Sequence, residues 1–361
     1  MPPIEPPATI LFTGMASTLH VVSANGYFAT YAVQDLLKRG YDVVGTVRSP
    51  AKGEEMKKLF AEYGQRLRYA VVSDITQPEA FDQVMKEYEF NGVAHAASPV
   101  NAQPRGTVDE FFGPIVDGTV NLLESVKKPN VKRVVYTSTC GAMLHHQKGV
   151  QHTEAHWNEN SLRVVEEHGN NSSYRDLYRA SKTLAEKAAW KHFEENKEHV
   201  QYDLVTFLPS FILGASSIAL APMHNVASRD QLTSTTLVAS TIRQPRPTSE
   251  YNDIAYYVVH AKDAAALHSL AFTNSDAAGH RIIGVAADAT WQDIYDALNE
   301  NPAFPNVPRG IPGSHCRPDS GSEDWDTSYS QKLLGKQFIG MKQCFRETEE
   351  YYQKKGWAFM P

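Results

Sequence analysis

A tyrosine and a lysine four residues apart, Tyr178 and Lys182, are the pair in this sequence best suited to chemistry. The surrounding pattern predicts a long helix, and on an α-helix residues four apart lie one turn apart on the same face. A nearby ammonium is expected to lower the pKa of a phenol, which is ordinarily about 10. The phenol can then pass a proton to a carbonyl oxygen while hydride reaches the carbonyl carbon. The spacing therefore indicates a reductase, although single pairs of this kind also occur on ordinary helix surfaces.

The charge balance and composition exclude several classes of protein. The chain of 361 residues carries 35 basic and 41 acidic side chains and has no long basic run, so nucleic acid is not an expected partner. We expect no membrane partner, because no apolar stretch is long enough to span a bilayer. The opening Met-Pro-Pro-Ile-Glu lacks the pattern of a secretory signal, and the cysteines (Cys140, Cys316 and Cys344) are few and far apart. We therefore expect a cytoplasmic protein with reduced thiols.

Short β-branched runs alternate with helical patterns through the first two hundred residues. This alternation is typical of a parallel sheet with helices on both faces, so it predicts a Rossmann-type, doubly wound α/β fold. Such folds bind their ligands at the carboxyl ends of the strands. The predicted strands are Ala8–Thr13, Asp42–Val47, Arg68–Val72, Gly92–Ala96, Arg133–Ser138 and Asp203–Leu208.

The pattern loosens after Pro209, and the C-terminal part carries many Pro, Gly and Ser residues between short helical pieces at Trp291–Asn299 and Gly340–Lys355. Another apolar run, Ile254–His260, predicts a further strand. We expect residues 1–209 to form the Rossmann domain, with residues 254–275 returning to it. Residues 210–253 and 276–361 are then expected to form a smaller, discontinuous domain that binds the substrate.

The sequence around the tyrosine and lysine is similar to a known catalytic helix. The string Tyr-Arg-Ala-Ser-Lys-Thr-Leu-Ala-Glu-Lys-Ala-Ala-Trp at 178–190 resembles that of the extended short-chain dehydrogenase/reductases. More narrowly, it resembles the branch that contains dihydroflavonol reductases and fungal aldehyde, ketone and methylglyoxal reductases. Shorter matches follow the same order along nearly the whole chain, at residues 45–49, 94–99, 134–139, 208–210 and 257–263.

The resemblance implies NADPH-dependent reduction of an aldehyde or ketone to an alcohol. It makes Tyr178 the proton donor, and Lys182 the residue that lowers the tyrosine pKa and holds the nicotinamide ribose. Thr139 stands where the family usually has a serine that orients the substrate carbonyl, and a threonine keeps that hydroxyl. Arg48 follows the second strand, where an arginine suits the 2′-phosphate of NADPH and an acidic residue would suit NADH.

The resemblance also implies where the cofactor lies. Lys52 would be a second contact to the phosphate, Asp74 would contact the adenine, and the segment after the fourth strand would lie along the cofactor. The complete set that the resemblance assigns to cofactor binding is Thr13, Gly14, Asn25, Gly26, Tyr27, Phe28, Arg48, Lys52, Asp74, Ala96, Ala97, Ser98, Tyr178, Lys182 and Pro209.

The phosphate-binding loop departs from the family pattern Thr-Gly-x-x-Gly-x-x-Ala. Here Met15–Ser23 separates Thr13-Gly14 from the Asn25-Gly26 that completes the motif. The extra residues interrupt the element in which backbone N–H groups meet the pyrophosphate. Three explanations are open: the residues loop out, they shift the strand register so that residues 21–23 replace the strand end, or they are a sequence or gene-model error.

Two rival functions remain open at this point. A sugar-nucleotide epimerase or dehydratase of the same superfamily would retain NAD, but Arg48 and the reductase-like Arg179-Ala180-Ser181 argue against it. A catalytically impaired sensor or scaffold that binds NADP(H) is favoured by the interrupted phosphate loop. The intact Thr139, Tyr178 and Lys182 argue against that alternative.

Residue types that can bind zinc gather between the fifth strand and the catalytic helix, at Cys140, His145, His146, His152, Glu154 and His156. Their spacing fits no common zinc pattern, so we expect no metal site.

We expect the polar run at 170–173 to cap the catalytic helix, and Phe211, Met223 and Tyr256 to line the substrate pocket. The sequence leaves open the identity of the carbonyl substrate and whether the protein is a monomer or a homodimer.

The interrupted phosphate loop yields a first prediction. A variant that lacks Met15–Ser23 should bind NADPH more tightly than the full chain, because its glycines return to the spacing that places backbone N–H groups on the phosphates. Calorimetric titration of both proteins with NADPH measures the difference. Equal dissociation constants would show that the extra residues do not disturb the phosphate contacts.

Overall fold

The computed structural model describes residues 3–14, 25–98, 107–128, 130–145, 147, 149–215, 238, 240–314, 319 and 322–354, with the side chains of Asn25 and Gly26 excepted. Met15–Ser23, the segment that interrupts the phosphate loop, lies outside the described residues, as do His146, Met223 and Cys316.

The main sheet has seven parallel strands in the order β3-β2-β1-β4-β5-β6-β9. This order reverses direction next to β1, as in a doubly wound Rossmann sheet, so the predicted fold is confirmed. The six strands expected in the first two hundred residues are all present, each within one residue of its predicted ends. The strands of this sheet are β1 (Thr9–Thr13), β2 (Asp42–Val47), β3 (Leu67–Val71), β4 (Gly92–His95), β5 (Arg133–Thr137), β6 (Asp203–Pro209) and β9 (Arg281–Gly284).

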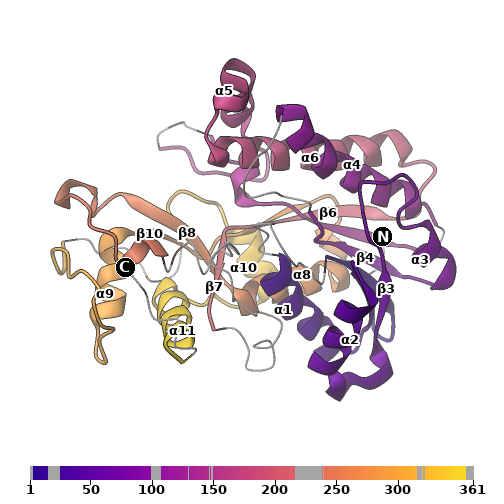
Figure 1. Cartoon of the computed structure of the whole chain (residues 1–361), viewed down its shortest axis with the longest axis horizontal. Helices are drawn as coiled ribbons and strands as arrows, with labels where there is room; N and C mark the ends of the chain where they lie inside the picture. The colour runs from indigo at the N-terminus through magenta and orange to yellow at the C-terminus, as the bar shows by residue number, and fades with distance from the viewer. Residues whose placement is uncertain are drawn as a thin grey trace.

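Helices cover both faces of this sheet, as Figure 1 shows. Successive side chains of a strand point to opposite faces, and β1 illustrates it: Ile10 and Phe12 belong to one buried cluster and Leu11 to the other. The first cluster packs under α1 and α8, and the second under α3, α4 and α6. These helices are α1 (Asn25–Lys38), α3 (Asp82–Glu87), α4 (Val108–Ser125), α6 (Tyr174–Asn196) and α8 (Ala261–Thr273); α2 (Pro50–Leu59) and α5 (Glu159–His168) complete the N-terminal set.

A second, three-stranded sheet lies to the left of the main sheet in Figure 1, with the order β10-β8-β7. It has its own buried core, which it shares with α9 and α11. Its strands are β7 (Phe211–Leu213), β8 (Ile254–His260) and β10 (Ala287–Thr290), and the C-terminal helices are α9 (Trp291–Asn299), α10 (Ser328–Leu334) and α11 (Met341–Lys354).

Two strands, β8 and β9, divide the C-terminal half of the chain between the two sheets, and β9 was not among the strands that the sequence predicted. β8 begins the segment 254–275 that was expected to return to the Rossmann domain, yet it pairs with β7 and β10. Conversely, β9 lies within 276–361 and pairs with β6 at the edge of the main sheet. An apolar run identifies a strand but not its neighbours, because pairing is decided by contacts between distant parts of the chain.

A buried ion pair fastens β5 to β6 at their amino ends. Arg133 is 1% exposed, and its Nη2 donates to Asp203 Oδ2 at 2.8 Å. The same guanidinium donates to the carbonyl oxygens of Ala271 and Asn274, so it also holds the end of α8 against the sheet.

None of the helices in the described part of the chain has the length and apolar content that crossing a membrane requires.

Replacing Arg133 with methionine should destabilise the protein by about 3–5 kcal/mol, because it removes the guanidinium of a buried ion pair and leaves the Asp203 carboxylate buried. Urea unfolding measures this loss. The matched control is Arg163→Met on α5, where the guanidinium is 67% exposed and lies 4.0 Å from Glu167, and where a change of less than about 1 kcal/mol is expected. Similar losses in both variants would contradict the assignment of stability to the buried pair.

Candidate active site

The structure brings the three predicted catalytic residues together at the carboxyl ends of the main strands. Thr139 follows β5, and its Oγ1 accepts from Gly141 N at 3.2 Å, which closes a short turn at Cys140–Ala142. Tyr178 and Lys182 lie one turn apart near the start of α6, whose first turn is capped by Ser173. The expectation that the run at 170–173 caps this helix is confirmed, since the Ser173 hydroxyl accepts from Asp176 N at 3.1 Å.

The Tyr178 phenol is protonated near neutral pH. Burial raises its pKa to about 12, while a hydrogen bond with the Thr139 hydroxyl and the Arg179 guanidinium act in the opposite direction. Lys182, which the resemblance implied would lower this pKa, is not among the groups that shift it here, and the loss of water around the phenol outweighs the groups that lower it.

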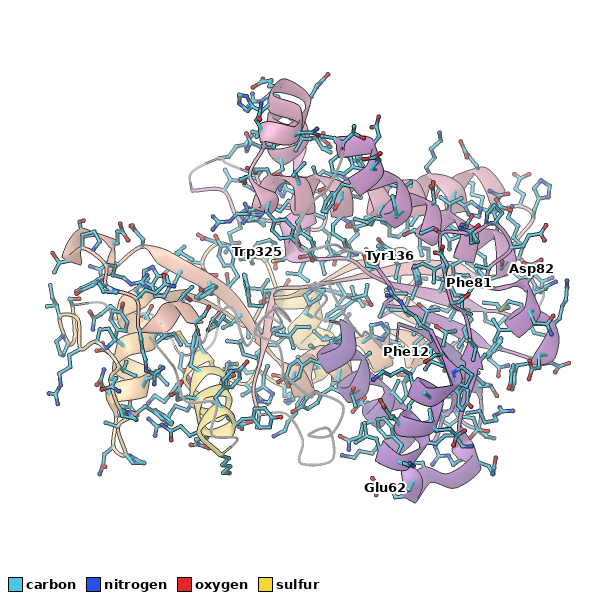
Figure 2. All side chains as sticks on the ribbon, in the orientation of Figure 1. Phe12, Glu62, Phe81, Asp82, Tyr136 and Trp325 are labelled. Carbon is cyan, nitrogen blue, oxygen red and sulfur yellow. The ribbon has the colours of Figure 1, made fainter. Side chains whose placement is uncertain are left out.

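The side chain of Lys182 contacts the end of β5. It is 4% exposed, and its Nζ donates to the carbonyl oxygen of Thr137 at 3.1 Å and lies 3.5 Å from the hydroxyl of Tyr136. Burial lowers the pKa of Lys182 to about 8, and the Glu186 carboxylate partly offsets that effect. Figure 2 labels Tyr136 in the middle of the molecule.

A buried carboxylate that the sequence reasoning missed anchors this helix. Glu186 is completely buried and accepts from Ser138 Oγ at 2.6 Å, from Thr206 Oγ1 at 2.9 Å and from Arg281 Nε at 2.7 Å. Its partners come from the end of β5, from β6 and from β9. The spacing Lys182–Glu186 offered a signal, because it repeats the four-residue interval of Tyr178–Lys182 on the same helical face.

The ends of β1 and β4 approach each other closely at the expected phosphate loop. Thr13 Oγ1 lies 2.7 Å from His95 Nδ1 and accepts from Ala97 N at 3.2 Å, so this buried hydroxyl joins the two strand ends. Gly14 has φ +90°, and a Cβ added to it would lie 2.7 Å from Ala97 N. Only glycine fits this left-handed backbone and close contact. Burial lowers the pKa of His95 to about 3, so its imidazole is neutral.

The next predicted cofactor residues begin α1. Asn25 and Gly26 are its first residues, but their side chains lie outside the described part of the structure. The side chains of Tyr27 and Phe28 are buried: the Tyr27 hydroxyl donates to Gly214 O at 2.7 Å, and Phe28 packs near the ring of Phe207. A cofactor contact from these two residues would therefore come from the backbone of the first helical turn.

The residues expected to hold the adenine ribose lie after β2 and β3. Arg48 is exposed, and its charge contributes to the lowered pKa of Asp74. The larger causes of that lowering are the hydrogen bonds that Asp74 accepts from the backbone and hydroxyl of Thr76, so Asp74 holds its own turn. Lys52 forms an ion pair with Glu55 at 2.8 Å. Arg48 is thus the cation in this group that is available to a phosphate.

The remaining predicted cofactor residues follow β4 and β6. Ala96 is buried, Ala97 and Ser98 are half-buried, and Ser98 Oγ is buried without a hydrogen-bond partner. An unpaired buried hydroxyl is unfavourable, and a bound ligand would satisfy it. The carbonyl oxygen of Pro209 lies 3.5 Å from Thr139 Oγ1, so the end of β6 is next to the hydroxyl of Thr139.

Between β5 and α6, the rings of His145 and His152 stack on each other, and the ring of His152 also stacks on that of Trp325. The ring of His152 lies 4.1 Å from that of His145 and 4.3 Å from that of Trp325, and backbone hydrogen bonds join His152 to Asp324 and Asp326. Trp325 also packs in a buried cluster with residues of the turn after β5. In Figure 2 it lies in the middle of the molecule, on the side of Tyr136 that faces the smaller sheet.

Within the described residues, no group of three or more His, Cys, Asp or Glu side chains is arranged to hold a metal ion. Glu154, for example, accepts from His280 Nδ1 at 2.8 Å and from Arg281 N at 3.3 Å. Of the residues expected to line the substrate pocket, Phe211 and Tyr256 pack edge to face on β7 and β8, with ring centroids 4.9 Å apart.

Comparison with known proteins places the chain in a family. The model of the NAD dependent epimerase/dehydratase family matches residues 20–286, which is most of the chain. The chain belongs to this family. The resemblance to extended short-chain dehydrogenase/reductases that the sequence indicated is thereby confirmed.

Individual relatives are similar along nearly their whole length. A putative uncharacterised oxidoreductase of Saccharomyces cerevisiae is 32% identical, with 94% of this chain and 99% of the relative covered. The NADPH-dependent methylglyoxal reductase GRE2 of the same yeast is 29% identical, with 92% and 96% covered. The crystal structure of yeast methylglyoxal/isovaleraldehyde reductase Gre2 complexed with NADPH matches with a TM-score of 0.80 at 28% identity, covering 97% of this chain and 100% of that one.

Proposed function

We propose that this protein reduces an aldehyde or ketone to an alcohol, using NADPH. The observation that carries the proposal is the meeting of the Thr139 and Tyr178 hydroxyls at the carboxyl end of β5, with Lys182 buried beside them. Relatives named as NADPH-dependent reductases, which this chain matches along nearly its full length, support the same activity.

In this proposal, the two hydroxyls bind the carbonyl oxygen of the substrate. The Tyr178 phenol, protonated because its pKa is about 12, donates its proton to that oxygen as negative charge develops there. Thr139 orients the carbonyl through its hydroxyl, which the turn at Cys140–Ala142 holds in place. The Lys182 ammonium, anchored on Thr137 O, supplies positive charge next to the reacting atoms.

Several observations fit NADPH, which when bound supplies the hydride. The close approach of Gly14 to Ala97 leaves room for backbone only, as phosphate-binding turns require. The unpaired hydroxyl of Ser98 lies on the same edge of the sheet. Arg48 is an exposed cation at the end of β2, where it suits a 2′-phosphate. These residues, together with Lys182 and the backbone of Pro209, would hold the cofactor.

The rival functions predict different outcomes for the same protein. An epimerase or dehydratase would retain NAD through purification, whereas we propose exchange of NADPH and NADP⁺ at each turnover. A sensor or scaffold would bind NADPH but would not oxidise it over a panel of aldehydes and ketones. Consumption of NADPH with formation of the alcohol supports the reductase.

Replacing Tyr178 with phenylalanine should lower kcat by roughly 100- to 10,000-fold and leave NADPH binding intact, because only the proton donor is removed. The matched control is Tyr174→Phe, one turn earlier on α6, whose buried hydroxyl has no hydrogen-bond partner. That control should retain most of its activity. Activity of Tyr178→Phe comparable to that of the control would exclude Tyr178 as the donor.

The pH profile should follow Lys182. Its pKa is lowered to about 8, so the ammonium is present below that pH and is lost as the pH rises through it, while Tyr178 stays protonated. We therefore expect kcat/KM for carbonyl reduction to fall above about pH 8. Lys182→Arg should shift this decline to higher pH, because a guanidinium keeps its charge. A profile of the unmodified enzyme that stays level from pH 7 to 9.5 would contradict a catalytic role for the ammonium.

A further inference from the structure

Two arginines share the catalytic face of α6. Arg175 and Arg179 lie three residues before and one residue after Tyr178, and the positions 175, 178, 179 and 182 follow the spacing that places residues on one side of a helix. The face that carries the proposed proton donor therefore carries three cations, of which Lys182 is buried, Arg179 half-buried and Arg175 exposed.

Neither guanidinium group takes part in the hydrogen bonds and ion pairs that hold the described part of the fold together. Among the described residues, the guanidinium groups of Arg175 and Arg179 form no hydrogen bond and no ion pair, whereas Arg133, Arg243 and Arg281 are each tied to a buried carboxylate. The acidic neighbour on the same helix, Asp176, already accepts hydrogen bonds from the hydroxyls of Ser161 and Ser173. The two arginines therefore retain donors for a ligand.

Arg179 lies next to the reacting groups. Its Cγ is 3.2 Å from the position that a Cβ on Gly141 would take, so its stem lies on the turn that holds Thr139. Its charge acts on the Tyr178 phenol and on the buried Cys140 thiol, and burial lowers the pKa of Arg179 itself. A charge in such partly dehydrated surroundings interacts more strongly with an opposite charge than one in open water.

Two tyrosines of β8 lie within electrostatic range of these cations. Arg175 opposes the rise in the pKa of Tyr256, and Arg179 interacts with Tyr257, whose phenol is neutral because burial raises its pKa. Arg246 reaches Tyr256 as well; its guanidinium lies 3.1 Å from the ring centroid of Trp291 and donates to Thr241 O at 2.8 Å. Arg175 of α6 and Arg246 of the smaller domain therefore act on the same phenol, that of Tyr256.

We propose that the substrate is an oxo acid, an aldehyde or ketone that also carries a carboxylate, and that Arg179 binds this carboxylate while Arg175 attracts it. The inference rests on the proposed reductase function, because it concerns the second half of the same substrate. A guanidinium matches the planar carboxylate with two parallel hydrogen bonds. The more exposed Arg175 contributes through its field, which raises the rate of encounter and weakens with salt.

The test compares oxo acids with their methyl esters, which keep the carbonyl and lose the charge. With saturating NADPH, kcat/KM is measured for pyruvate, levulinate and succinate semialdehyde, each against its ester. We expect the unmodified protein to prefer at least one acid over its ester. Arg179→Met should lower that acid-to-ester ratio by roughly 10- to 100-fold, the range for a lost charged hydrogen bond. Arg175→Met should lower it less, with an effect that shrinks at high salt.

The exposed Arg163 of α5 provides the matched control, and Arg163→Met should leave the ratio unchanged. The oxo-acid inference is overturned if the unmodified protein reduces every ester with the same efficiency as its acid. It is also overturned if Arg179→Met does not change the acid-to-ester ratio. Either result leaves the reductase function standing. Failure to reduce any acid, ester or neutral aldehyde would instead refute the proposed function. In that case the melting temperature tests the carboxylate site. An oxo acid should raise the melting temperature of the NADPH-loaded protein but not that of its Arg179→Met variant.

Discussion

The buried carboxylate of Glu186 fixes α6, the helix that carries Tyr178 and Lys182, to the sheet. It accepts hydrogen bonds from Ser138, Thr206 and Arg281, which belong to three adjacent strands or strand ends. A charge without water around it is tolerable only when such partners surround it, so the helix has one favourable position on the sheet. Lys182 and Tyr178 precede Glu186 by one and two helical turns, so the position of the helix on the sheet also fixes where these two side chains begin.

Burial, more than neighbouring charge, sets the protonation states in the site. It raises the pKa of Tyr178 to about 12 and lowers the pKa of Lys182 to about 8, because both charged forms lose contact with water. The phenol therefore carries its proton at neutral pH and the ammonium is close to losing one. Among the cations of the catalytic face, Arg179 rather than Lys182 opposes the rise in the tyrosine pKa.

The C-terminal segment packs against the loop that follows Thr139. Trp325 stacks on His152 and packs with the turn after β5, and Tyr257 of β8 donates to Asp324 at 3.0 Å. Residues close to the end of the chain thus contact the loop that follows Thr139. The surroundings of this loop are consequently built from segments that are far apart in the sequence.

The sequence by itself determined six of the seven strands of the main sheet, the helix that carries Tyr178 and Lys182, and the family. Local spacing suffices for these, because periodicity and motif order are properties of neighbouring residues. Tertiary structure decided that β8 joins the smaller sheet and β9 the larger one, that Asp74 holds its own turn, and that burial raises the tyrosine pKa. Strand neighbours, hydrogen-bond partners and loss of water all depend on which distant segments the folded chain brings together, and no local pattern contains that information.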